Sequence, residues 1–130
     1  MLAIIEKGSD GLYSIRTEQR IGSFCPGGFG ESVKIAKEDF MDSIGEAIEA
    51  LPEGQSVTIA DIDIEFQYDL QSFFNFFDYF NTSKLANHLG INESQLRQYK
   101  AGIAYPNDKT TARILDGLHS IGKDLSAVSL

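Results

Sequence analysis

The sequence predicts an α+β fold in two small domains, a β-β-β-α-β domain over residues 1–69 and an all-α domain over residues 70–130. Short alternating apolar segments separated by glycine-rich turns open the chain, and an apolar period of about 3.6 residues dominates from residue 70 onward. The charge is also divided. Residues 1–70 carry 14 acidic and 5 basic residues, a net −9, whereas residues 71–130 carry 5 and 6, a net +1. This division suggests two modules with different partners.

The composition is that of a globular protein. Hydrophobic residues make up 42% and charged residues 23% of the chain, which argues against a disordered or membrane-embedded protein. No segment approaches the roughly 20 apolar residues of a membrane span. The N-terminus reaches Glu6 too soon for a signal peptide, so we expect a cytoplasmic protein. Cys25 is a lone cysteine, and neither His88 nor His119 has a companion at metal-ligand spacing, so we expect no cofactor and no metal.

The first strands are predicted from a hairpin signal. Residues 2–5 and 12–15 are mostly apolar and flank Gly8-Ser9-Asp10-Gly11, whose Asp-Gly pair tolerates the positive φ angles of a tight turn. A third short strand is predicted over Ile21 to Cys25. The following Gly27-Gly28-Phe29-Gly30 has no Lys-Ser/Thr pair and does not complete G-x-G-x-x-G. We therefore interpret it as a tight turn rather than as a phosphate-binding loop.

One helix and one long strand complete the first domain. Residues 33–51 repeat apolar side chains with a helical period and stop before Pro52, and Gln55 to Tyr68 alternates as a strand. One face of this strand carries Ile62, Ile64 and Phe66, and the other carries Asp61, Asp63 and Glu65. Three carboxylates on one face allow a divalent-metal nuclease site. We favour a solvated or partner-facing strand, because two-metal sites usually recruit acids from several elements.

The order strand, strand, strand, helix, strand resembles the HicB antitoxin family. The resemblance lies in the hairpin Ile5-Glu6-Lys7 … Asp10-Gly11-Leu12-Tyr13 and in the helix start Gly30-Glu31-Ser32-Val33, with Ala36 three residues on. The resemblance implies a truncated ribonuclease-H-like module that blocks a small basic HicA-like toxin, which cleaves messenger RNA. It also implies a C-terminal module that represses the operon. This chain carries Phe24-Cys25-Pro26 where the family commonly has a turn of the Pro-Gly-Cys type.

The second domain is predicted to open with an aromatic helix. Asp69 is a suitable N-cap, and one helix face then carries the apolar side chains Leu70, Phe73, Phe74, Phe77 and Phe80. We interpret this stripe as core or as a dimer seam.

Residues 82–102 carry the strongest motif of the chain. Ala86 is small where two helices cross, and Gly90, four residues later, allows a sharp turn. Asn92 is a suitable N-cap for the second helix, which Gly102 ends. The spacing resembles the helix-turn-helix of phage-repressor and Xre-type regulators, and the apolar positions from Ile114 to Ile121 resemble their trailing helix. The alternative is a helical hairpin with another purpose, such as dimerisation.

The exposed side chains of the second helix are predicted to read bases. Arg binds guanine O6 and N7, Gln pairs with adenine, and Glu accepts from the amino group of cytosine. The predicted base-reading residues are Asn92, Glu93, Ser94, Arg97 and Gln98. Other polar side chains are placed to hold the DNA backbone. The predicted phosphate contacts are Thr82, Ser83, Lys100 and Lys109.

Three functions follow, in order of preference. The first is an operon-repressing antitoxin without catalytic activity, which occludes a small basic toxin and binds operator DNA. With few cations per subunit, it would act as a homodimer or homotetramer that presents recognition helices about 34 Å apart. The second is a transcriptional regulator whose N-terminal module dimerises or senses a ligand. The third is a metal-dependent nuclease that uses Asp61, Asp63 and Glu65. Residues 125–130 fit either a short strand or a loose tail.

Overall fold

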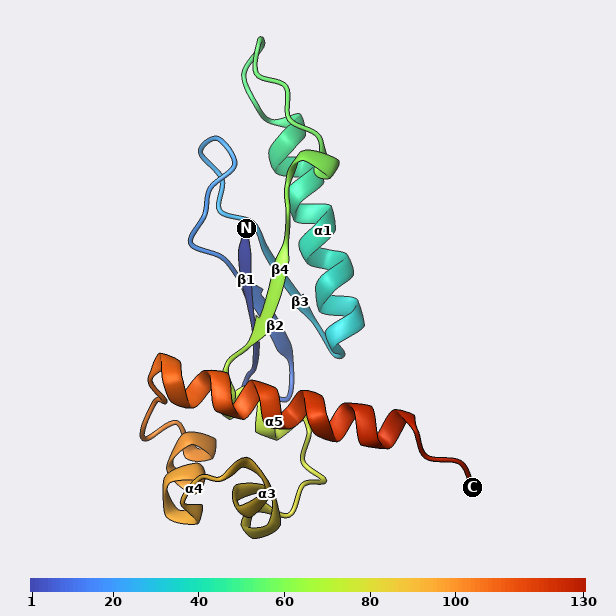
Figure 1. Cartoon of the computed structure of the whole chain (residues 1–130). Coiled ribbons are helices and arrows are strands. Elements are labelled where there is room, and N and C mark those ends of the chain that lie inside the picture. Colours follow the sequence, from blue (N-terminus) through green and yellow to red (C-terminus); the bar gives the residue numbers. More distant parts are fainter. The chain divides into compact units, whose positions relative to one another are not determined.

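The computed structural model describes residues 1–130, without the side chain of Asp108. The chain forms two compact units, which we call unit 1 (Met1–Phe76) and unit 2 (Phe77–Leu130) (Figure 1). Unit 1 holds a four-stranded mixed sheet with helices, and the elements of unit 2 are helices, so the α+β class is confirmed. The units divide after Phe76 rather than after residue 69, and the helix that begins at Leu70 therefore belongs to unit 1.

The sheet of unit 1 has the strand order β3-β2-β1-β4. The strands are β1 (Leu2–Lys7), β2 (Tyr13–Arg16), β3 (Gly27–Gly30) and β4 (Glu65–Tyr68). The predicted hairpin is confirmed, since β1 pairs antiparallel with β2 and places Ile5 opposite Ile15. On the other side of β1, β4 runs parallel and places Tyr68 opposite Ile5. A parallel pair needs a crossover connection, and helix α1 (Val33–Glu49) lies within it.

The third strand lies elsewhere than predicted. Ile21 and Phe24 only bond each other's backbone across a tight turn, with N–O distances of 2.8 and 3.0 Å. The segment Gly27–Gly30, predicted as a turn, is β3 and pairs with β2. A Cβ atom at Gly28 would lie 2.5 Å from the Ala36 carbonyl oxygen and 2.6 Å from the Phe40 nitrogen. Gly28 therefore serves the close packing of a helix on this strand, and the prediction was wrong because that contact is tertiary.

The predicted helix is present as α1 (Val33–Glu49), and it covers one face of this sheet (Figure 1). Ser32 caps the helix, since its hydroxyl oxygen accepts a hydrogen bond from the Ile35 N–H at 3.2 Å. The buried face of the helix packs on the buried residues of β1 and β2. This core consists of Ala3, Ile5, Tyr13, Ile15, Ile21, Val33, Ala36, Phe40, Ile44 and Ala47.

The strand predicted over Gln55 to Tyr68 is shorter. Ile59–Asp61 forms the 3₁₀ helix η1, and β4 begins only at Glu65. The reason is the lack of a partner, because β1 begins at Leu2, opposite Glu65. The predicted alternation of faces is nevertheless present. Its apolar residues Ile62, Ile64 and Phe66 are half-buried, and its acids Asp61, Asp63 and Glu65 are exposed.

Helix α2 (Leu70–Phe76) ends earlier than the aromatic stripe predicted. Its start is confirmed, because the Asp69 carboxylate accepts a hydrogen bond from the Ser72 N–H at 3.1 Å. Ser72 in turn accepts from the Lys7 N–H at 2.7 Å, which ties the helix to β1. The ring of Phe76 lies edge-on to Tyr13, with centroids 5.7 Å apart. This part of the stripe is therefore core of unit 1, whereas Phe77 and Phe80 lie beyond the helix.

Unit 2 contains the helices α3 (Thr82–Leu89), α4 (Glu93–Ala101) and α5 (Asp108–Ser126). The buried side chains of these helices form a small core. Its members are Leu85, Ala86, Leu89, Leu96, Tyr99 and Ile114. Helix α5 continues through Ser126, and no strand forms over the described residues 125–130.

Candidate nucleic-acid interface

Helices α3 and α4 are joined by a three-residue turn whose geometry depends on Gly90. Gly90 has φ 69° and ψ 33°, the left-handed conformation that glycine adopts without steric cost. The turn is closed by two backbone hydrogen bonds, from Gly90 N–H to the Asn87 carbonyl at 3.2 Å and from Ile91 N–H to the Ala86 carbonyl at 2.9 Å. The predicted position and role of this glycine are confirmed.

Asn92 fixes the first turn of α4. Its carboxamide oxygen accepts hydrogen bonds from Ser94 N–H at 2.9 Å and from Gln95 N–H at 3.3 Å, which satisfies backbone donors that a helix start leaves unpaired. Asn92 was predicted to cap the helix and also to read a base. The cap is present, and it engages the oxygen that a bidentate contact with adenine would need.

The two sides of α4 differ sharply. Leu96 and Tyr99 face the core and are buried, whereas Ser94, Arg97 and Gln98 are exposed. A helix with this division presents one row of polar side chains to whatever approaches it from solvent. Three of the predicted base-reading residues therefore share one accessible surface.

The remaining predicted base reader, Glu93, is paired with Arg97. Arg97 Nη2 donates a hydrogen bond to Glu93 Oε1 at 2.6 Å, in an ion pair one helical turn apart. Both side chains stay accessible, with 67% of the Arg97 side chain and 40% of the Glu93 side chain exposed.

The predicted phosphate contacts lie in different places. Lys100 Nζ donates a hydrogen bond to Thr82 Oγ1 at 2.7 Å, which joins the end of α4 to the start of α3. Ser83 is exposed beside Thr82 in the first turn of α3. Lys109 is exposed at the start of α5. The structure thus brings Thr82, Ser83 and Lys100 into one neighbourhood.

Two residues of α5 support the α3–α4 turn, and sequence reasoning missed both. Arg113 Nη1 donates a hydrogen bond to the Gly90 carbonyl at 3.2 Å. A Cβ atom at Gly117 would lie 2.2 Å from Leu89 Cδ2, so α5 packs closely on α3 at this point. The sequence signal that could have identified them is Gly117, one helical turn after Arg113, at the edge of the apolar stripe of the predicted trailing helix.

The acids considered for a metal site do not converge. Asp61 accepts hydrogen bonds from the Thr58 N–H and hydroxyl, both at 2.9 Å, and these bonds lower the pKa of Asp61. Glu65 accepts from Gln67 Nε2 at 3.0 Å. Among the described side chains, no group of three or more His, Cys, Asp or Glu could hold a metal ion. The metal hypothesis therefore has no geometric support.

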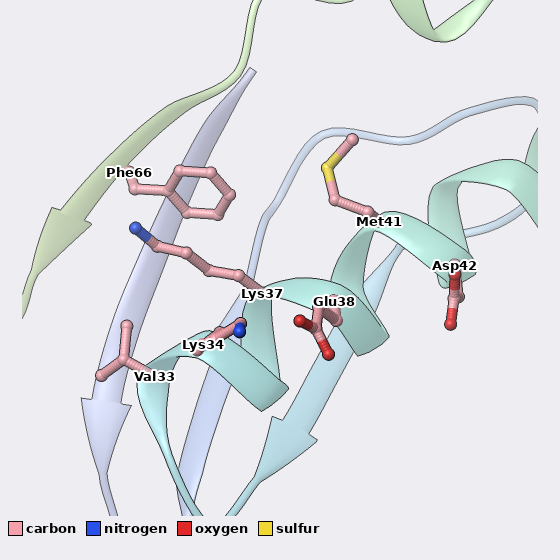
Figure 2. A pocket seen from close by; sticks show the side chains of 7 residues that line it. All are labelled: Val33, Lys34, Lys37, Glu38, Met41, Asp42 and Phe66. Atoms are coloured by element: carbon pink, nitrogen blue, oxygen red, sulfur yellow. The ribbon is translucent and has the colours of Figure 1, made fainter.

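A hollow of about 660 Å³ lies between α1 and β4 of unit 1 (Figure 2). Lys37 Nζ lies 4.6 Å from the centroid of the Phe66 ring, within the range of a cation–π contact. Two acids and a second lysine share the lining. The lining residues are Val33, Lys34, Lys37, Glu38, Met41, Asp42 and Phe66. This mixed charge and open shape do not single out one class of ligand.

The exposed side of α4 is therefore the candidate site that both the sequence motif and the geometry indicate.

Within the described residues, no helix combines the length and the apolar character needed to cross a membrane. Comparisons of the chain with protein-family models, with curated proteins and with solved structures found no match.

Proposed function

We propose that this protein is an operon-repressing antitoxin of a toxin–antitoxin system. In this proposal the α3–α4 pair is a helix-turn-helix that binds operator DNA, and unit 1 is a truncated ribonuclease-H-like module that occludes a small basic HicA-like toxin. The observation that carries the proposal is the exposed row Ser94, Arg97 and Gln98 on α4. The turn at Gly90 and the N-cap at Asn92 fix where this helix begins. No catalytic step is required.

The side chains of α4 have the chemistry that base recognition needs. In the major groove, the guanidinium of Arg97 reaches guanine O6 and N7, and the carboxamide of Gln98 matches adenine. Thr82, Ser83 and Lys100 flank this row and would bind phosphates, which fixes the register of the helix without reading sequence. Lys109, on a separate helix, would add a further phosphate contact.

Tight binding requires two copies, because unit 2 carries only 6 basic against 5 acidic residues. Helix α5 supplies a surface for pairing. It has 19 residues and α3 has 8, lengths of about 28 and 12 Å, so α3 cannot cover all of α5. Leu125, near the end of α5, is 63% exposed. Pairing through unit 2 also avoids the repulsion between two units 1, each with a net charge of −9.

Unit 1 supports the toxin-binding half of the proposal in two ways. Its order β1-β2-β3-α1-β4 is the order on which the resemblance to HicB antitoxins rests. Its net charge of −9 favours association with a basic protein and opposes association with nucleic acid.

Selection of duplexes from a random DNA pool at fixed salt tests the DNA-binding half. We expect the wild-type protein to enrich an inverted repeat, and the variant Arg97→Ala with Gln98→Ala to lose it. The matched control is Lys34→Ala with Gln55→Ala, which removes the same charge and the same carboxamide from exposed positions of unit 1, away from α4 and from the proposed pairing surface. Enrichment by the control but not by the α4 variant assigns recognition to α4. Failure of the folded wild-type protein to enrich any duplex would overturn the proposal.

Co-expression tests the toxin half. The probe is any small basic protein encoded beside this gene, expressed alone and then with the full chain. Growth arrest that the full chain relieves would support occlusion. Enrichment of DNA without a toxic neighbour would instead favour a transcriptional regulator whose unit 1 dimerises or senses a ligand.

A further inference from the structure

Glu93 is the acidic residue of α4 and lies beside the exposed row Ser94, Arg97 and Gln98. Its carboxylate accepts a hydrogen bond from Arg97 Nη2 at 2.6 Å, and the arginine is the more exposed side chain of the pair. Exposed pairs four residues apart in a helix change a folding equilibrium by only about two-fold. Helix stability is thus a weak reason for this pair.

A carboxylate on a DNA-facing surface has a cost, because it repels the phosphates that neighbouring cations attract. An arginine in the same place has a different problem. Its long side chain has many rotamers, and a free guanidinium can turn from a base edge toward a phosphate. A carboxylate that accepts a hydrogen bond from one guanidinium nitrogen reduces both problems. The arginine neutralises the charge of the carboxylate, and the carboxylate restricts the rotamers of the arginine.

We propose that Glu93 is a positioning residue that orients Arg97 toward one base pair, an inference that rests on the proposed DNA binding. The guanidinium has five N–H donors, and the bond to Glu93 uses one of them. The donors that remain suffice for a bidentate contact with guanine O6 and N7. Glu93 therefore sets specificity through Arg97 rather than by touching a base itself, as a direct contact with cytosine would require.

The experiment compares wild-type protein, Glu93→Gln and Arg97→Ala on the selected duplex and on its single-base variants, over a range of salt concentrations. Gln keeps the shape of the side chain and removes its charge. The control is Asp116→Asn, which removes one negative charge from an exposed position of α5 in the same unit. The helical circular dichroism of each variant shows that it is folded.

We expect the wild-type protein to prefer guanine at one position by about 5- to 150-fold. Arg97→Ala loses this preference together with affinity. Glu93→Gln reduces the preference at that same position to a few fold, while affinity for unrelated duplexes rises. The slope of log K against log salt steepens by about 0.9 in Glu93→Gln, because the released arginine now neutralises a phosphate. Asp116→Asn keeps the wild-type preference.

Two outcomes would overturn the inference and leave the proposed function intact. One is an unchanged guanine preference in Glu93→Gln. The other is loss of preference at a position different from the one that Arg97→Ala affects, which would make Glu93 a direct reader of a base. If the wild-type protein selects no duplex at all, the proposed function fails and this inference fails with it.

Discussion

Replacing Gly28 by alanine tests whether the close contact between β3 and α1 determines where the third strand forms. The added Cβ would meet the carbonyl oxygen of Ala36 at 2.5 Å and the nitrogen and Cβ of Phe40 at 2.6 and 2.8 Å. The first two atoms belong to the backbone of α1 and cannot rotate away. The helix or the strand must therefore move, and the buried face of α1 moves with it.

The cost can be bounded from known substitutions. Overpacking a tight core costs about 1–3 kcal/mol, and a clash with backbone belongs at the upper end of that range. Alanine recovers about 0.4–1 kcal/mol by restricting the unfolded chain. We expect Gly28→Ala to destabilise unit 1 by about 2–2.6 kcal/mol, which raises the opening equilibrium by roughly 30- to 80-fold.

Amide hydrogen exchange of β1 and β2 measures this opening directly, because their paired N–H groups exchange only when the sheet opens. The matched control is Gly45→Ala within α1, where an added Cβ meets nothing within 4 Å. Alanine is favoured over glycine inside a helix by about 0.8–1 kcal/mol, so this variant should exchange more slowly than wild type. Equal exchange in Gly28→Ala and wild-type protein would refute the steric argument.

Three further predictions concern unit 2. In thermal unfolding, Gly122→Ala should stabilise it by about 0.8–1 kcal/mol, because the new Cβ meets nothing within 4 Å, whereas Gly117→Ala should stabilise it less, because the side chain of Leu89 must rotate away from a Cβ that lies 2.2 Å from its Cδ2; equal gains would contradict the packing of α5 on α3. Asn92→Ala should cost about 0.5–2 kcal/mol in denaturant unfolding through loss of the α4 cap, and Asn92→Asp should retain most of that stability; equal losses would contradict the capping role. Leu125→Asp should shift sedimentation toward the monomer without loss of helical circular dichroism; an unchanged oligomer would remove the end of α5 from the proposed pairing surface.

The helices were easier to predict than the strands because their signals are local. Ser32, Asn92 and Gly90 act within one turn of the helix ends that they cap. Each capped helix is also long enough for its apolar residues to show a helical period. Strand β3 is different, since its glycines reflect a helix that packs on them from outside the strand. Helix α2 ends at Phe76 although the aromatic period continues to Phe80. The boundary between the two compact units depends on tertiary packing, which local periodicity does not reveal.

The candidate site followed the same rule. The exposed row on α4 could be predicted, because Leu96 and Tyr99 define its opposite side by spacing alone. The bond from Lys100 to Thr82 spans 18 residues, and the bond from Arg113 to the Gly90 carbonyl spans 23. Contacts of that kind depend on how the helices cross, and the spacing of residues within a single helix does not reveal the crossing.

The unequal charge of the two units has a consequence for the association rate of the proposed complex with operator DNA. In the proposed repressor, a net −9 on unit 1 would repel every duplex alike, so collisions with DNA would be rarer, and residence on unrelated sequence shorter, than for a repressor with a basic module in that place. Added salt weakens this repulsion together with the attraction of unit 2, over a screening length of about 8 Å at physiological ionic strength. Association rates should therefore fall less steeply with salt than the cations of unit 2 alone would dictate.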